Sequence, residues 1–221
     1  KFSMWGIIPI KNVNEAKHRL ESILSPKERR DLFVVMFEDV LATMMKVPEL
    51  DRVSVATICP TAVEIARRNG ASILSTGLDR GQTAAVAMAA KALYEDGIES
   101  MLMIPGDVPL VTVEEIQTVL EVHGKEPSIT IVPARDEKGS NCIALSPPTA
   151  LPLCFGANSY FPHLENAQKH GLDLNTPKLH GIGLDIDTPE DLMELCRLPE
   201  RTRTQVYLRK QKILERLTQN A

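Results

Sequence analysis

The stretch Met101-Leu102-Met103-Ile104-Pro105-Gly106-Asp107-Val108-Pro109-Leu110 decides the fold class of this chain. Its apolar first half is typical of a strand that is buried on both faces. A Pro-Gly turn ends the strand, and we expect Asp107 to follow as an unpaired carboxylate. Thr112-Val113-Glu114-Glu115 then has the pattern of a helix capping box. This order indicates an α/β protein that presents Asp107 at the carboxyl end of its sheet, where ligands bind. An ordinary turn role for Asp107 is the alternative.

Strands and helices alternate on both sides of that stretch. Hydrophobic periodicity and turn residues predict strands at 4–10, 52–58, 72–75, 128–133, 142–145 and 178–184. They predict helices at 25–45, 61–69, 84–94, 161–170 and from residue 188, with loops at 11–19, 76–82 and 135–141. The alternation predicts an α/β fold with a mostly parallel sheet. We expect one domain over residues 4–197 and a basic helical tail over 198–221.

Composition excludes several classes of protein. The chain has 221 residues and a formal net charge of −4, which argues against binding nucleic acid through an excess of Lys and Arg. No apolar stretch approaches the roughly 20 residues that a membrane helix needs, and we recognise no signal peptide. The cysteines are scattered without a C-x-x-C pair, which favours a reduced, cytoplasmic protein. The histidines show no ligand spacing either, so any metal should have oxygen ligands.

A basic group, Lys11, Lys17 and Arg19, follows the first predicted strand. The loop after that strand usually borders the ligand cleft of an open α/β sheet. Lys and Arg bind phosphates, so these residues can hold a triphosphate and neutralise a departing pyrophosphate. No GxxxxGK[ST] motif is present, so this is not a P-loop. A solvated charge run is the alternative.

An acidic group consists of Asp107 with Asp185 and Asp187. Residues two apart on an extended segment point the same way. Carboxylates placed like this repel each other unless a cation or a donor lies between them. Together with Asp107 they form a candidate Mg²⁺ site, because Mg²⁺ prefers hard oxygen ligands and substrate phosphates. Asp185 and Asp187 acting as turn and cap residues before Thr188 is the alternative.

A third group is small and polar: Gly139-Ser140-Asn141 and Phe155-Gly156-Ala157-Asn158-Ser159. Glycine lets backbone N–H groups approach an anion, and serine adds a hydroxyl donor. Two such loops can bind a second phosphorylated molecule, although ordinary turn chemistry explains them as well. His163 follows on the first turn of a predicted helix, where packing, capping and ligand contact all remain open.

The C-terminal tail combines several Lys and Arg residues with Val206, Ile213, Leu214 and Leu217. The apolar side chains can pack within the chain or form a dimer contact. The basic face can instead attract an acidic partner or a lipid surface. We favour packing and expect a homodimer.

The ordered set of motifs resembles the 2-phospho-L-lactate guanylyltransferase family, which includes phosphoenolpyruvate guanylyltransferase relatives. The resemblance covers about residues 4–195 and rests on the stretches Trp5–Lys11, Ala16–Leu20, Leu24–Arg29, Pro105–Leu110, Phe155–Tyr160 and Leu184–Leu192. It implies a nucleotide-diphospho-sugar-transferase-like (GT-A type), Rossmann-like three-layer fold. It also implies transfer of GMP from GTP to 2-phospho-L-lactate, which releases pyrophosphate during coenzyme F-420 biosynthesis.

The resemblance also implies roles for individual residues. Asp107, Asp185 and Asp187 correspond to metal-binding carboxylates for Mg²⁺. Ser140, Gly156 and Ser159 match positions that hold the phosphorylated three-carbon acid. The nucleotide side would comprise Lys11, Lys17, Arg19, Gly81, Thr83 and Asp107. Asp107, Lys17 and Arg19 are the candidate catalytic residues.

The chain departs from the family pattern at two places. Ser140 stands where threonine is common, and Gly81-Gln82-Thr83-Ala84-Ala85 stands where Gly-Leu-Asn-Ala-Ala is frequent. The second departure leaves the preference for guanine open. Phosphoenolpyruvate and 3-phosphoglycerate remain alternative acceptors. A sugar-phosphate or molybdopterin nucleotidyltransferase and a non-catalytic nucleotide sensor are the alternative functions.

Overall fold

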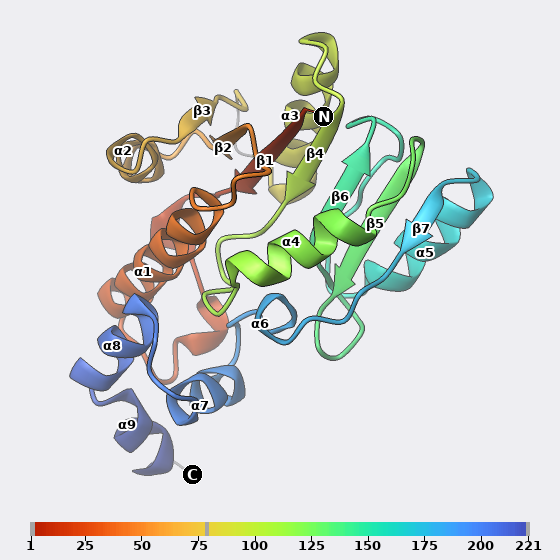
Figure 1. The fold of residues 1–221 in the computed structure, drawn as a ribbon. Helices are drawn as coiled ribbons and strands as arrows, with labels where there is room; N and C mark the ends of the chain where they lie inside the picture. Colours follow the sequence, from red (N-terminus) through yellow and green to blue (C-terminus); the bar gives the residue numbers. More distant parts are fainter. Residues whose placement is uncertain (1–2, 78–79, 220–221) are drawn as a thin grey trace.

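One mixed sheet organises the chain, in the order β3-β2-β1-β4-β6-β5-β7 within the described residues (Figure 1). The computed structural model describes residues 3–77 and 80–219. The predicted loop at 76–82 and the predicted tail therefore include residues 78–79 and 220–221, which lie outside the described part. The strands are β1 Met4–Pro9, β2 Arg52–Ala56, β3 Ser72–Leu74, β4 Ser100–Met103, β5 Ser128–Pro133, β6 Ser140–Ser146 and β7 Asp173–Asn175. β6 runs antiparallel to both neighbours and the other pairs are parallel, which confirms the mostly parallel sheet.

Helices cover both faces of this sheet and produce three layers (Figure 1). They are α1 Pro26–Met44, α2 Pro60–Arg68, α3 Gln82–Glu95, α4 Val113–Val122, α5 Tyr160–Lys169, α6 His180–Gly183, α7 Pro189–Arg197, α8 Arg203–Lys210 and α9 Ile213–Gln219, with 3-10 turns at Val13–Glu15 and His18–Leu20. Side chains alternate along the strands, so Ile8 and Leu102 pack with α1, α2 and α4, whereas Ile7 and Met103 pack with α3 and α5. Burial on both faces explains the continuous apolar run of β4.

The strand order changes direction at β1, which lies between β2 and β4. Connections that leave the carboxyl ends of two such strands diverge and open a crevice between them. Lys11 follows β1 and Asp107 follows β4, so both residues belong to the edge where this crevice opens. The sheet topology therefore positions the basic loop opposite the acid.

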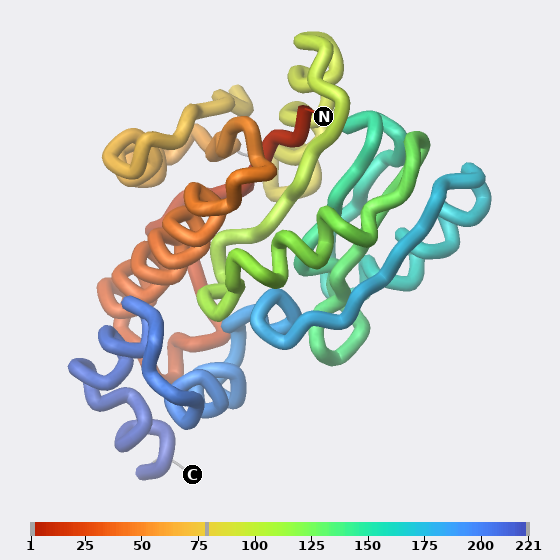
Figure 2. Tube along the Cα trace, in the orientation of Figure 1, coloured from red at the N-terminus to blue at the C-terminus, as the bar shows by residue number. Residues whose placement is uncertain are grey.

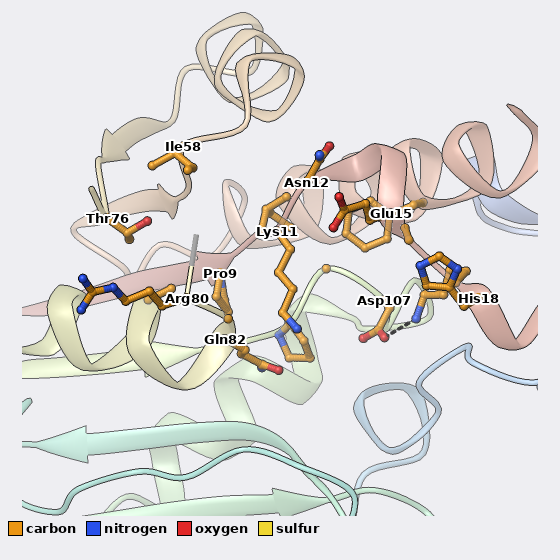
Figure 3. A pocket seen from close by; sticks show the side chains of 18 residues that line it. Pro9, Lys11, Asn12, Glu15, His18, Ile58, Thr76, Arg80, Gln82 and Asp107 are labelled. Carbon is orange, nitrogen blue, oxygen red and sulfur yellow. Dashed lines mark hydrogen bonds and ion pairs between the residues drawn. The ribbon is translucent and has the colours of Figure 1, made fainter. Parts of the chain in front are cut away.

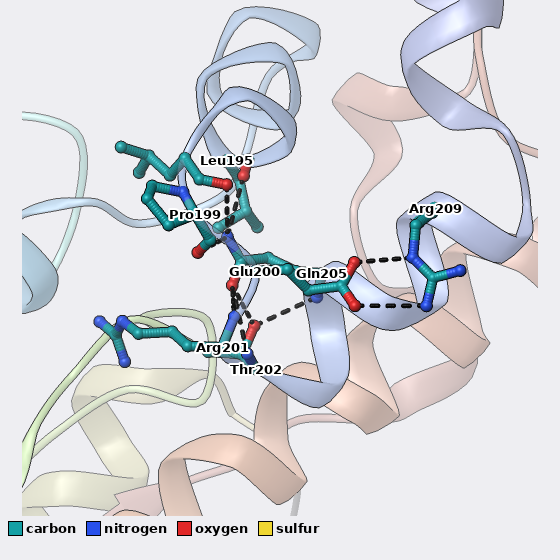
Figure 4. A network of polar contacts seen from close by, with 8 residues as sticks. Leu195, Pro199, Glu200, Arg201, Thr202, Gln205 and Arg209 are labelled. Atoms are coloured by element: carbon teal, nitrogen blue, oxygen red, sulfur yellow. Dashed lines mark hydrogen bonds and ion pairs between the residues drawn. The ribbon is translucent and has the colours of Figure 1, made fainter.

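The C-terminal helices pack within the chain. Leu208, Ile213 and Leu217 are buried in a cluster with Leu32 and Met36 of α1. The Gln205 side chain donates to three backbone carbonyls at and just after the end of α7, those of Leu195, Leu198 and Pro199 (Figure 4). Segment 184–197, near the C-terminus, also lies beside the loop that follows β1 (Figure 2).

Several predicted elements differ from those of the structure. The predicted strand at 178–184 is the one-turn helix α6, because the Glu115 carboxylate accepts the Gly181 N–H at 2.8 Å and a side chain at Gly181 would collide with the Leu110 carbonyl. The last strand is instead β7. Ser140 lies on β6 rather than in a loop, and α3 begins two residues before the predicted start. Among the described residues, the structure contains no helix that is long and apolar enough to span a membrane.

Candidate active site

Two clefts adjoin at the carboxyl edge of the sheet and share Gln82, Pro105 and Asp107 as a common wall. The first cleft, of about 420 Å³, lies among the segments after β1, β3 and β4 and the start of α3. The second cleft, of about 580 Å³, is lined by segment 134–141, segment 155–159 and the acids near residue 186. Asp107 is therefore accessible from both sides.

Lys11 extends across the first cleft toward the start of α3, where Gln82 lies (Figure 3). Gly81 caps that helix with a φ of 92°, a conformation that favours glycine. A Cβ atom at Gly81 would lie 3.9 Å from Cε of Lys11, so the lysine chain passes close to the helix start. A helix N-terminus carries a partial positive charge and attracts anions. The first cleft thus combines a cationic side chain with a helix N-terminus.

Lys17 links the basic loop to the acids. Its Nζ lies 2.6 Å from Oδ2 of Asp107 and 3.7 Å from Oδ1 of Asp187, and its side chain is only 7% exposed. Burial alone would lower the pKa of Lys17, but Asp107, with smaller contributions from Asp187 and Asp185, raises the pKa above its ordinary value. The prediction of an unpaired Asp107 is therefore wrong. Lys17 also has a φ of 60°, and such strain persists where the surroundings enforce it.

The loop after β4 is fixed against the segment that carries the other acids. The Asp107 carbonyl accepts the Ile186 N–H at 3.0 Å. Asn141, which is buried, donates at 3.0 Å to the Asp185 carboxylate. Burial and then the Asp107 carboxylate raise the pKa of Asp185, and the bond from Asn141 opposes this shift. Two like charges are thus held near each other around the same cleft.

The metal prediction can be compared with this geometry. Asp107, Asp185 and Asp187 all line the second cleft, and their hard oxygen atoms and mutual repulsion suit Mg²⁺. Within residues 3–77 and 80–219, however, no group of three His, Cys, Asp or Glu side chains is arranged to hold a metal ion. The Lys17 ammonium contacts two of the three acids instead. The donor set fits a magnesium ion chemically, and the role of these acids as ligands stays a prediction.

The second cleft has an ordered hydroxyl pair on its wall. Ser140 Oγ lies 3.1 Å from Ser159 Oγ and 2.8 Å from Nδ1 of His163. Nε2 of His163 accepts the Cys154 N–H at 3.0 Å, so the neutral ring carries its proton on Nδ1 and donates to Ser140. Burial lowers the pKa of His163, which favours this neutral form. Because Ser140 accepts the proton of His163, one hydroxyl proton joins Ser140 to Ser159 and the other hydroxyl proton of the pair remains available to an anion.

The structure brings most predicted site residues to these clefts. Lys11, Lys17 and Gly81 line the first cleft, whereas Arg19 lines the second and lies 3.0 Å from Asp187. Ser140, Gly156 and Ser159 line the second cleft, and their contact with the acid stays a prediction. Thr83 lines neither, because its hydroxyl accepts the Phe155 N–H at 2.9 Å and ties α3 to segment 155–159.

The structure gives more definite places to residues that sequence reasoning named only within a motif, and it adds Lys138, which sequence reasoning did not single out. Gln82 lines both clefts, and Asn141 orients Asp185. Lys138 lines the second cleft from the connection between β5 and β6. The departure from the usual Gly-Leu-Asn motif is the sequence signal that pointed toward Gln82. No comparable signal identified Lys138.

A mixed, mostly parallel sheet with a cationic cleft and an acid- and hydroxyl-lined cleft around one carboxylate defines a nucleotidyltransferase-type protein. The fold is similar to that of a putative nucleotide-diphospho-sugar transferase from Desulfovibrio desulfuricans G20, with a TM-score of 0.80 at 18% identity over 99% of this chain and 98% of that one. This likeness confirms the predicted fold class.

Residues 4–219 match the family described as "Guanylyl transferase CofC like", and the chain belongs to this family of guanylyltransferases. It is 32% identical to the phosphoenolpyruvate guanylyltransferase of Sphaerobacter thermophilus, over 86% of this chain and 91% of that protein. It is 33% identical to the 3-phospho-D-glycerate guanylyltransferase of Colwellia psychrerythraea, over 87% and 90%. It is 31% identical to the 2-phospho-L-lactate guanylyltransferase of Methanothermobacter thermautotrophicus, over 93% and 89%. The chain is therefore an enzyme, and the predicted family is confirmed.

Proposed function

We propose that this guanylyltransferase transfers GMP from GTP to 2-phospho-L-lactate, releases pyrophosphate and forms lactyl-2-diphospho-5′-guanosine for coenzyme F-420 biosynthesis. The observation that carries the proposal is the shared wall at Asp107, with a cationic cleft on one side and a hydroxyl-lined cleft on the other. A transfer between two phosphorylated molecules needs two such clefts that meet where the phosphates react.

GTP is assigned to the first cleft. Lys11 and the N-terminus of α3 supply positive charge for its phosphates. The loop at Lys17 brings a second ammonium to the common wall, and the raised pKa of Lys17 keeps this group protonated at neutral pH. Lys17 therefore acts as a fixed charge and not as a proton acceptor.

The small acid is assigned to the second cleft. The Ser140–Ser159 pair offers a hydroxyl donor, and the backbone at Gly156 is open, because a Cβ there would meet no atom within 4 Å. His163 sets the direction of the Ser140 hydrogen bond from behind. This arrangement suits an anion that is bound by short, directional hydrogen bonds.

The reaction needs no protein nucleophile. An oxygen of the acceptor phosphate attacks the α-phosphorus of GTP, a P–O–P bond forms, and the bond from the α-phosphorus to the oxygen of the departing pyrophosphate breaks. The attacking phosphate is already anionic, so catalysis consists of alignment and neutralisation of charge. Lys11 and Lys17 supply positive charge on the side of the nucleotide, and Arg19, which lines the second cleft, supplies it on the side of the acceptor.

Asp107, Asp185 and Asp187 are the residues that would hold Mg²⁺. When bound, Mg²⁺ would offset phosphate charge near the common wall. Asn141 fixes the Asp185 carboxylate, and Arg19 pairs with Asp187, so the chain restricts where these oxygen atoms lie. Removal of divalent cations with a chelator should abolish turnover, and addition of Mg²⁺ should restore it.

Phosphoenolpyruvate is the second candidate acceptor, favoured by the name of the Sphaerobacter thermophilus relative. It carries its phosphate on the second carbon, as 2-phospho-L-lactate does, and differs by a double bond between the second and third carbons, which makes the second carbon planar. 3-Phosphoglycerate carries the phosphate on the third carbon and extends further from the common wall. The second cleft must distinguish these three acids by shape as well as by charge.

Pyrophosphate release in a matrix of nucleotides and acids tests the proposal. GTP, ATP, CTP and UTP are each combined with 2-phospho-L-lactate, phosphoenolpyruvate and 3-phosphoglycerate, with and without Mg²⁺. The largest kcat/KM is expected for GTP with 2-phospho-L-lactate. A larger kcat/KM with phosphoenolpyruvate would identify phosphoenolpyruvate as the acceptor. No pyrophosphate release with any of the three acids would refute the proposed function.

A further inference from the structure

We propose that Lys138 binds the carboxylate of the acceptor acid and makes the second cleft selective for acceptors that carry this second negative charge. The inference rests on the proposed function, because it assumes that a phosphorylated acid occupies the second cleft. Lys138 lines this cleft on segment 134–139, which connects β5 to β6.

The backbone of this segment is fixed by hydrogen bonds. The Ala134 N–H donates to the Gly139 carbonyl at 2.8 Å and closes the loop. The Lys138 N–H donates at 3.0 Å to Oδ1 of Asp136, and the Lys138 carbonyl accepts the Tyr160 N–H at 2.9 Å. Lys138 itself is exposed. A fixed backbone thus presents a long cationic side chain at the rim of the cleft.

Two of the other charged residues of the segment have partners outside the cleft, whereas Asp136 lines the cleft and accepts the Lys138 N–H. Arg135 forms an ion pair with Glu194 of α7, and Glu137 lies 2.7 Å from Nζ of Lys178. For Lys138, the structure of the described residues shows no ion pair. The local charges are therefore arranged so that the Lys138 ammonium remains available to a ligand.

The acids that line the second cleft outnumber its basic residues, which favours a further cation for an anionic acceptor. The described acids that line this cleft are Asp107, Asp136, Asp185 and Asp187, and the described basic residues are Arg19 and Lys138. Arg19 pairs with Asp187 at 3.0 Å. An acceptor with a phosphate and a carboxylate would be repelled by these acids, and bound Mg²⁺ would offset charge only near the common wall. Lys138 is the described lining cation that no protein carboxylate engages.

The position of Lys138 identifies the group that it meets. The acceptor phosphate attacks the α-phosphorus, so it must lie at the common wall beside Asp107. Lys138 does not belong to that wall, because of the two clefts it lines only the second, from the connection that leads into β6, the neighbour of β4. Neighbouring strands lie about 5 Å apart. The acid therefore extends from Asp107 toward Lys138, and its carboxylate is the group that arrives there.

The experiment compares two acceptors and four proteins. One acceptor is the acid that gives the highest kcat/KM, and the other is the matching phosphate ester with a methyl group in place of the carboxylate. For 2-phospho-L-lactate this ester is isopropyl phosphate, assayed as a competitive inhibitor if it does not turn over. The proteins are the unaltered chain, Lys138→Gln, Lys138→Arg and Lys125→Gln. Lys125 is an exposed lysine before β5, at the other end of the β5–β6 pair, and controls for net charge.

Lys138→Gln should raise KM for the acid by about fivefold, in the range expected for an exposed ion pair, and the effect should shrink as salt screens it. Lys138→Gln should leave KM for GTP unchanged, as well as KM or the inhibition constant for the ester. Lys125→Gln should leave KM for the acid unchanged, and Lys138→Arg should retain the preference for the acid over the ester. An equal loss for acid and ester, or an undiminished preference in Lys138→Gln, would overturn the inference alone. Absence of turnover by the unaltered chain would instead refute the proposed function, and the inference with it.

Discussion

The first cleft and the second cleft share Asp107 but are built from different chemistry. The first depends on charge, because Lys11 extends toward a helix N-terminus and Lys17 is held on the common wall. The second depends on oriented hydrogen bonds, because His163 directs its proton to Ser140. A polyphosphate can be bound by mobile charges, whereas a small acid needs donors in set directions. The difference predicts which kinetic constant each cleft controls.

The largest effect is expected at the wall itself. Asp107→Asn should lower kcat by about a thousandfold, as removal of a preorganised charge from a reacting site does. The fold should persist, because Asp187 still lies 3.7 Å from the Lys17 ammonium. Steady-state pyrophosphate release and circular dichroism measure the two outcomes. Asp136→Asn is the matched control, since Asp136 lines only the second cleft and an amide can still accept the Lys138 N–H. Comparable losses in both variants would show that Asp107 has no special role.

A change confined to the first cleft should act on the nucleotide. Lys11→Met should raise KM for GTP by about thirtyfold, because a charge-assisted hydrogen bond to a phosphate is lost. KM for the acid should stay within about twofold, because sites without shared partners behave independently. Lys91→Met on α3 is the control, since Lys91 pairs with Glu95 at 3.8 Å on an exposed helix face. If KM for the acid rose as much as KM for GTP, the two clefts would not be separate sites.

A change confined to the second cleft should give the opposite pattern. Ser159→Ala should raise KM for the acid by about tenfold, through loss of one hydrogen bond to an anion, with KM for GTP unchanged. Ser140 keeps its bond to His163 in this variant. Ser146→Ala is the matched control, because Ser146 lies at the other end of β6 and also contacts a histidine, His123, at 2.8 Å. An unaltered KM for the acid in Ser159→Ala would remove Ser159 from the acceptor site.

Much of the fold was predictable because local patterns determine it. The buried run before Asp107 is a strand, the capping box at Thr112 starts a helix as its spacing predicts, and a helix also begins after Thr188. Strand β7 was missed because it has only three residues, Asp-Leu-Asn, which are too few to show a hydrophobic period. The helix α6 was missed because a carboxylate distant in sequence, Glu115, stabilises it. Tertiary hydrogen bonds of this kind leave no local signal.

The composition of the site was easier to predict than its connections. The acids, the basic loop and the serines were visible as residue types, and the structure places them around two clefts. The pairing of Lys17 with Asp107 spans 90 residues of sequence, and the bond from Phe155 to Thr83 spans 72. Such contacts follow from the strand order of the sheet, which sequence patterns alone do not fix. Thr83 remains a predicted nucleotide-binding residue, although its hydroxyl contacts Phe155, which lines the second cleft.

The smallest expected effect concerns the buried His163 and the half-buried His123, which lie at opposite ends of the β5–β6 pair. Burial lowers the pKa of both His163 and His123, although Asp173 opposes the shift at His123. A lowered pKa means that the unfolded chain binds a proton first as the pH falls. The stability that each neutral ring contributes is therefore fully present above the ordinary pKa of about 6.5 and is lost progressively below it.

The two histidines should differ in how much they contribute to this loss. His123 contacts the hydroxyls of Thr130, Ser128 and Ser146, which can turn to accept from a protonated ring. Nε2 of His163 instead faces the fixed Cys154 N–H, which cannot become an acceptor. Denaturant unfolding between pH 7.5 and pH 5 should therefore show less pH dependence in His163→Gln than in His123→Gln. If His123→Gln removed more of the pH dependence than His163→Gln, the hydrogen bonds of His163 beside the second cleft would not be the less adaptable ones.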